Sequence, residues 1–69
     1  MKLKINGESK ELKENNLTIT ELLTVESVKD ADMVSVQLNG EFVERKNFPE
    51  TSIANGDEID FLYFMGGGN

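Results

Sequence analysis

The sequence predicts a small α+β domain in which one helix packs across a mixed sheet of four to five strands. Three observations support this fold class. Stretches near both ends and in the middle of the chain alternate apolar and polar residues, as half-buried strands do. Two Asn-Gly pairs follow such stretches, and this dipeptide favours a tight hairpin turn. One helix-start signal lies between them, so the order of elements favours a single sheet with the helix on one face.

The first hairpin is predicted at the start of the chain. Met1–Ile5 alternates apolar residues with two lysines, which is typical of a half-buried strand. Asn6-Gly7 then supplies the two residues with positive φ that a type I′ turn requires. We therefore expect Glu8–Leu12 to return as the second strand.

The helix start is the clearest local signal. Thr18 and Glu21 have the spacing of a capping box, in which each side chain accepts a hydrogen bond from the backbone of the other residue. Leu17 and Leu22 occupy the two hydrophobic positions that accompany this motif. A short helix is predicted over Ile19–Val25.

A second hairpin and a crossing segment follow. Met33–Leu38 alternates, Asn39-Gly40 forms the turn, and Glu41–Glu44 is the predicted returning strand. The stretch Arg45–Ile53 contains the only proline and should cross the molecule irregularly. Two apolar residues of this stretch should anchor it to the core: Phe48 and Ile53.

The last strand is predicted over Glu58–Met65. It places Ile59, Phe61, Tyr63 and Met65 on one face, and its second half is apolar on both faces. A strand of this kind is usually central in its sheet, which would place it beside the first strand.

Composition narrows the class of function. The chain has 69 residues and 13 acidic against 7 basic residues, for a formal net charge of -6, which argues against nucleic acid and membranes as partners. It contains neither cysteine nor histidine, so it offers no thiolate nucleophile and no imidazole base. No constellation of other side chains suggests catalysis. We therefore expect a non-enzyme, and we expect a cytoplasmic location because no signal-like or long apolar segment is present.

The end of the chain is the most unusual stretch. Three glycines, Gly66, Gly67 and Gly68, follow the last strand and precede Asn69. Glycine loses more backbone freedom on ordering than any other residue, so we expect a domain of residues 1–65 and a flexible tail of residues 66–69. Such a tail would present a carboxylate on an arm without side chains.

Several short pieces occur together along nearly the whole chain, and their order and spacing make the set specific. They are the Asn6-Gly7 hairpin, Thr18-Ile19-x-Glu21-Leu22-Leu23, Val36-x-Leu38-Asn39-Gly40-Glu41, Arg45, Asn55-Gly56-Asp57-x-Ile59 and the ending Phe64-x-Gly66-Gly67-Gly68. With these pieces the sequence resembles the ThiS sulfur carriers. The resemblance implies the β-grasp, or ubiquitin-like, fold.

The resemblance also implies a function. In that family an E1-like (ThiF-type) enzyme uses ATP to adenylate the C-terminal glycine carboxylate, which then becomes a thiocarboxylate. The thiocarboxylate donates sulfur during thiazole formation for thiamin, on a ThiG-type thiazole synthase or another sulfur acceptor. Gly68 would then carry the sulfur, and Gly66 and Gly67 would thread a channel in the partner. The carrier itself would bind no cofactor.

Asn69 departs from this pattern because the family ends on Gly-Gly. With Asn69 attached, Gly68 has no free carboxylate to activate. Either a processing protease removes Asn69, or Asn69 is an artificial addition, or this chain has lost carrier function. The first two explanations are favoured because a plain structural domain has no evident use for Gly66–Gly68.

Other functions stay open at this point. The chain could be a MoaD-like carrier for molybdopterin, a carrier for cysteine or homocysteine synthesis, or a protein modifier joined to lysines. It could also be a β-grasp interaction module whose glycine tail is incidental. An apolar patch of Leu62, Phe64 and Met33, on the sheet face away from the helix, is the expected docking surface.

The sequence leaves the roles of an acidic cluster and of one arginine open. Asp57, Glu58 and Asp60 could pair with a basic partner near the tail, or they could form a solvated edge. Arg45 could pack its aliphatic stem and pair with a neighbouring acid.

Overall fold

The computed structural model describes residues 1–29 and 31–63. It contains seven strands, one α-helix and two short 3₁₀ helices within these residues. In chain order the elements are β1 (Lys2–Ile5), β2 (Glu8–Glu11), β3 (Leu17–Thr18), α1 (Ile19–Val25), η1 (Ala31–Met33), β4 (Val34–Leu38), β5 (Glu41–Val43), η2 (Arg45–Glu50), β6 (Ser52–Ile53) and β7 (Glu58–Tyr63).

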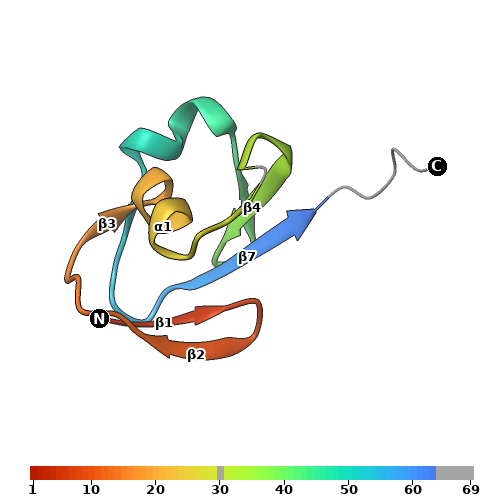
Figure 1. Ribbon diagram of the computed structural model, residues 1–69. Coiled ribbons are helices and arrows are strands. Elements are labelled where there is room, and N and C mark those ends of the chain that lie inside the picture. Colours follow the sequence, from red (N-terminus) through yellow and green to blue (C-terminus); the bar gives the residue numbers. More distant parts are fainter. Residues whose placement is uncertain (30, 64–69) are drawn as a thin grey trace.

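Five strands form one mixed sheet in the order β2-β1-β7-β4-β5, and α1 lies across one face of it (Figure 1). β7 pairs in parallel with β1 and antiparallel with β4. The predicted fold class is therefore confirmed, as is the prediction that the last strand is central and lies beside the first.

The two Asn-Gly pairs that were expected to form hairpins form the predicted turns. Asn6 and Gly7 have φ values of 50° and 85°, and Asn39 and Gly40 have values of 53° and 86°. Two successive positive φ angles define a type I′ turn, whose twist matches that of the flanking strands. The first turn places Ile5 opposite Glu8.

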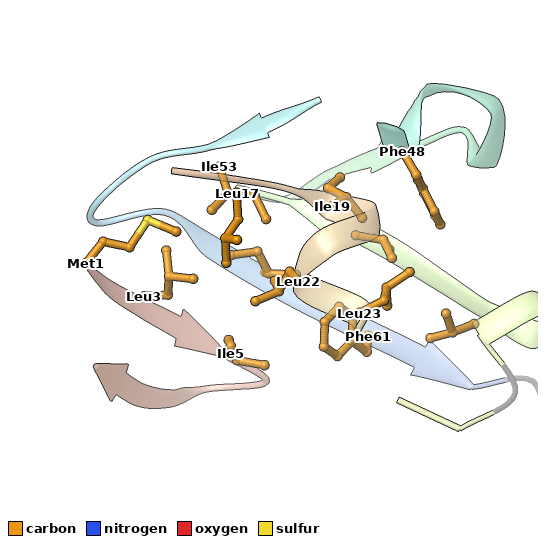
Figure 2. Close-up of a cluster of buried hydrophobic side chains, with 13 residues drawn as sticks. Met1, Leu3, Ile5, Leu17, Ile19, Leu22, Leu23, Phe48, Ile53 and Phe61 are labelled. Atoms are coloured by element: carbon orange, nitrogen blue, oxygen red, sulfur yellow. The ribbon is translucent and has the colours of Figure 1, made fainter. Parts of the chain in front are cut away.

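The core lies between α1 and the sheet. Ile19 and Leu22 of the helix are fully buried, and so is Ile59 of β7. Complete burial of an aliphatic side chain of this size stabilises a fold by about 1.5–3 kcal/mol. Figure 2 shows how the buried side chains converge from both layers, and the full set is Met1, Leu3, Ile5, Leu17, Ile19, Leu22, Leu23, Val34, Val36, Phe48, Ile53, Ile59 and Phe61. The predicted anchoring by Phe48 and Ile53 is thus confirmed.

The crossing segment is more regular than predicted. Residues 45–50 form the 3₁₀ helix η2, and β6 pairs with β3 in a separate two-stranded sheet. In that pair Leu17 lies opposite Ile53, and both side chains are buried. Strands of two residues are too short to show an alternating pattern, so their pairing depends on packing against distant residues.

Four predicted strand ends are also too long. The residues that lie outside the strands are Met1, Leu12, Met33 and Glu44. Met33 belongs to η1, and Glu44 precedes η2 as its N-terminal cap. The last strand is described only as far as Tyr63, so its predicted continuation to Met65 lies outside the described residues.

The capping box at α1 is formed as predicted. The Glu21 backbone N–H donates to Thr18 Oγ1 at 3.2 Å, and the Thr18 N–H donates to Glu21 Oε1 at 2.8 Å. These bonds satisfy backbone groups that the first turn of a helix leaves without partners. A helix as short as α1 depends on such bonds because it is only 7 residues long.

Replacing the capping residue should destabilise the domain measurably. Thr18→Ala removes one side of the capping box and should lower the free energy of unfolding by about 1 kcal/mol. Urea unfolding followed by circular dichroism measures this. Thr20→Ala is the matched control, because Thr20 is exposed within the same turn and alanine is a better helix former. Equal losses in the two variants would contradict a specific capping role.

Candidate functional site

The end of β7 is where the described part of the chain leads toward the glycine tail. There β7 lies beside the start of β4, with Tyr63 opposite Val34 and Leu62 opposite Ser35. The carboxyl end of the central strand therefore emerges next to the first residues of β4 and the preceding η1.

The side chains of Leu62 and Tyr63 lie on opposite faces of the sheet. Tyr63 is opposite the buried Val34, so it shares the face that carries α1, yet it is 49% exposed at the end of the sheet. Leu62 points away from α1, on what we call the outer face, and is 45% exposed. The prediction that Leu62 lies on the face away from the helix is confirmed.

Phe42 is a further exposed apolar residue on the outer face, and the sequence analysis missed it. It lies opposite Gln37 of β4, which in turn lies opposite Asp60 of β7, so the three side chains form one row across the sheet. Phe42 is 65% exposed, the largest exposed fraction among the large hydrophobic residues described. Alternation in Glu41–Glu44 carried the signal, because an inward Val43 implies an outward Phe42.

Met33 is placed differently from the prediction. We expected it within the strand, but it ends η1 and is 58% exposed just before Val34. Because Val34 lies opposite Tyr63, Met33 stands at the same end of the sheet as the carboxyl end of β7. Five of the predicted site residues lie outside the described residues: Phe64, Gly66, Gly67, Gly68 and Asn69.

Exposed apolar side chains gather around the sheet. Within residues 1–29 and 31–63 the large hydrophobic residues with the greatest exposure are Val25, Met33, Phe42, Leu62 and Tyr63. Only Val25 belongs to the helix. We call Met33, Phe42 and Leu62 the apolar surface. Exposed apolar side chains on or beside one face of a sheet often mark an interaction site.

Two of the three acidic residues near the last turn lie away from the carboxyl end of β7. Asp57 directly precedes β7 and Glu58 begins it, at the opposite end of the strand from Tyr63, so of the two alternatives left open, pairing with a partner beside the tail is not favoured for either. The Asp57 carboxylate accepts from Asn39 Nδ2 at 3.2 Å and from the Ala54 N–H at 2.8 Å. Asp57 therefore fastens the turn before β7 to the second hairpin. Glu58 lies 3.8 Å from Lys4 in an exposed ion pair.

Three further features of the described residues concern metal binding, a perturbed ionisable group and membrane spanning. Within them no group of three or more His, Cys, Asp or Glu side chains could hold a metal ion. The pKa of Lys10 is raised above its ordinary value by the hydrogen bond and the negative charge of Glu26, 2.9 Å away, but this pair joins β2 to the end of α1. Over the same residues no helix is long and apolar enough to cross a membrane.

The sheet, the helix and the exposed end of the central strand together define the class of fold. A mixed five-stranded sheet clasps a single helix, and its central strand ends beside exposed apolar side chains. This is the architecture of the β-grasp, or ubiquitin-like, fold.

Comparison with known proteins makes the assignment specific. A model of the ThiS family matches residues 3–68. The crystal structure of the thiamine biosynthesis protein ThiS from Geobacter metallireducens is 45% identical and superposes with a TM-score of 0.92, over 99% of this chain and 100% of that one. A solution structure of a thiamine biosynthesis protein from Geobacter metallireducens is 46% identical with a TM-score of 0.82, over 100% of this chain and 90% of that one. The chain therefore belongs to the ThiS family of small sulfur-carrier proteins, and the predicted resemblance is confirmed.

One curated relative is much longer. A thiazole synthase from Paramagnetospirillum magneticum is 33% identical over 69 residues, which are 100% of this chain and 21% of that protein. The chain thus spans about a fifth of the length of this relative.

The structural role of Asp57 can be tested against its neighbour. Asp57→Ala removes the acceptor of two hydrogen bonds and should lower the free energy of unfolding by about 1–2 kcal/mol. Glu58→Ala is the control, because it removes only an exposed ion pair and should cost at most about 0.5 kcal/mol. Urea unfolding of both variants measures the difference. If Asp57→Ala is as stable as Glu58→Ala, the carboxylate does not fasten the turn.

Proposed function

We propose that this protein carries sulfur for thiamin biosynthesis as a thiocarboxylate on Gly68, after removal of Asn69. A ThiF-type enzyme adenylates the Gly68 carboxylate with ATP, and a ThiG-type thiazole synthase receives the sulfur. The protein acts as a carrier and co-substrate, and it contributes no acid, base or bound cofactor of its own.

The match to the ThiS family over residues 3–68 is the main support for this proposal. The match includes all three glycines and ends one residue before Asn69. The thiazole synthase relative supports the choice of acceptor, since it contains a segment similar to this entire chain.

The chemistry requires only a terminal glycine from the carrier. A carboxylate oxygen of Gly68 attacks the α-phosphorus of ATP, pyrophosphate leaves, and an acyl adenylate forms. Hydrosulfide then attacks the acyl carbon, the bond to the phosphate oxygen breaks, and AMP leaves with its electron pair. The product is a thiocarboxylate, and no oxidant or reductant is needed. Glycine offers little steric hindrance to the attacking sulfur, and the enzyme supplies the proximity.

The folded body supplies recognition in this proposal. Leu62 and Phe42 share the outer face, and Met33 lies at the end of the sheet from which the tail departs. A partner that covers these side chains would remove exposed apolar area from water while drawing the tail into its active site. The net charge of -6 would favour a partner whose docking surface is basic.

Processing of Asn69 can be tested with two forms of the protein. A form that ends at Gly68 should be adenylated and converted to a thiocarboxylate by the ThiF-type enzyme with ATP and sulfide, whereas the form with Asn69 should not react. Intact-mass spectrometry measures the change, which is the replacement of one oxygen by sulfur. A form that ends at Gly67 is the control for tail length.

Three results bear on this proposal. Loss of Asn69 in extract from the native cell, followed by gain of sulfur, would support the complete route. Reaction of the form that retains Asn69 would contradict the need for processing. If the form ending at Gly68 gives neither adenylate nor thiocarboxylate with an enzyme that activates another carrier, the chain is no sulfur carrier, and the interaction-module alternative becomes the better hypothesis.

The apolar surface should contribute to the affinity for the adenylating enzyme. Phe42→Ala and Leu62→Ala each remove an exposed apolar side chain and should weaken binding by about tenfold, which corresponds to ~1.4 kcal/mol. Calorimetric titration with the ThiF-type enzyme measures this.

Val25→Ala is the matched control for this experiment. Val25 is an exposed apolar residue of α1, outside the apolar surface, and its loss should leave the affinity unchanged. Unchanged affinity in both Phe42→Ala and Leu62→Ala would place the docking surface elsewhere.

A further inference from the structure

Arg45 lies where β5 has stopped pairing with β4. The last pair between these strands is Val36 with Val43, because the chain turns into η2 at Glu44. If the antiparallel register continued for two more residues, residue 45 would lie opposite Val34. The Val34 carbonyl points toward β5 but faces no strand residue there.

The Arg45 side chain takes the place of the missing strand residue. Its Nη2 donates to the Val34 carbonyl at 2.7 Å, and its Nη1 donates to the Ala31 carbonyl at 2.7 Å. The sequence left open an ion pair with a neighbouring acid. Among the described residues, however, the guanidinium bonds two backbone carbonyls instead, which corrects that expectation.

The core fixes the position of the guanidinium. Its central carbon lies 5.3 Å from the centre of the Phe48 ring, and Phe48 is only 4% exposed. A cation over an aromatic face within about 6 Å is attracted to the ring. The Arg45 guanidinium therefore stacks on the buried Phe48 ring of its own 3₁₀ helix, and its N–H groups donate to backbone carbonyls of η1 and β4.

The two accepting carbonyls lie on either side of Met33. None of the η1 residues is buried, and Ala31 packs against the core while staying partly exposed. The hydrogen bonds to Ala31 and Val34 fix the backbone before and after the exposed Met33. Val34 in turn lies opposite Tyr63, at the end of β7.

We propose that Arg45 is a positioning residue for partner docking, because it holds Met33 in a fixed place beside the carboxyl end of β7. The proposal rests on the proposed function, in which the adenylating enzyme covers the apolar surface. A Met33 held in place before binding loses less conformational freedom when the partner covers it. Arg45 touches no reacting atom and acts through Met33.

Lysine cannot replace arginine in this role. The planar guanidinium directs donors to two acceptors at once and stacks on the ring, whereas an ammonium is a single point charge on a flexible stem. Arg45→Lys thus keeps the charge and most of the stem, but it loses the simultaneous hydrogen bonds to the two carbonyls. Lys46→Met is the matched control, since Lys46 is 79% exposed on the same 3₁₀ helix and pairs with Glu44.

A double-mutant cycle tests the proposal. Arg45→Lys, Met33→Ala and the double variant are compared with the unaltered protein, all ending at Gly68, in calorimetric titrations with the ThiF-type enzyme. We expect Arg45→Lys to weaken binding by about tenfold when Met33 is present and by less than about twofold when residue 33 is alanine. Lys46→Met should bind as the unaltered protein does. Thermal unfolding of each variant verifies that the domain stays folded.

The outcomes separate this proposal from the proposed function. Equal losses from Arg45→Lys with and without Met33 would show that Arg45 does not act through Met33, and the proposal would fall. Unchanged affinity with a lowered melting temperature would assign Arg45 a purely structural role. If the unaltered form ending at Gly68 is neither bound nor adenylated, the proposed function itself fails, and this inference fails with it.

Hydrogen exchange gives a second readout that needs no partner. Arg45→Lys should speed exchange of the backbone amides of residues 31–34 by about tenfold or more, because local opening becomes easier. Exchange in α1 should stay the same. Unchanged exchange at residues 31–34 would show that the arginine does not hold this segment, which also overturns the proposal.

Discussion

The parallel pairing of β7 with β1 is the interaction on which the rest of the structure depends. It joins the two ends of the chain through Lys4 with Glu58 and Ile5 with Ile59, while the other edge of β7 pairs with β4. The two hairpins, each formed by neighbouring residues, become one sheet only through β7. The face that α1 covers is therefore complete only after the last strand has been added, and closing so long a loop costs entropy that the buried core must offset.

The same strand also connects the fold to the proposed function. Its first half is held in the core by Ile59 and Phe61, whereas Leu62 and Tyr63 are about half exposed at its end. A rigid strand that ends at an exposed edge holds its last residues in a defined direction, which suits a domain whose carboxyl terminus must reach into the active site of a partner. In the proposed function the partner supplies the chemistry, so the carrier needs a firm body and a recognisable surface.

Side chains complete the hydrogen bonding at three places where a strand of the sheet ends. Asn6 accepts from the Phe61 N–H at 2.8 Å beyond the end of β1, and Asn39 accepts from the Glu58 N–H at 2.9 Å beyond β4. Arg45 donates to the Val34 carbonyl beyond β5. Backbone groups at such sites cost free energy when they lack partners, and a side chain of fitting length satisfies them without further strand. Short strands thereby form a sheet with defined ends.

The sequence by itself determined the features that depend on neighbours in the chain: both type I′ turns, the capping box, the alternation of the long strands and the set of motifs typical of the ThiS family. Only the tertiary structure decided the pairing of β3 with β6, the place of Met33, the bond between Asn39 and Asp57 and the bonds of Arg45. Each of these depends on residues far away in sequence. An acid beside a turn or an arginine after a strand suits many environments, and its partners are set when distant elements pack together.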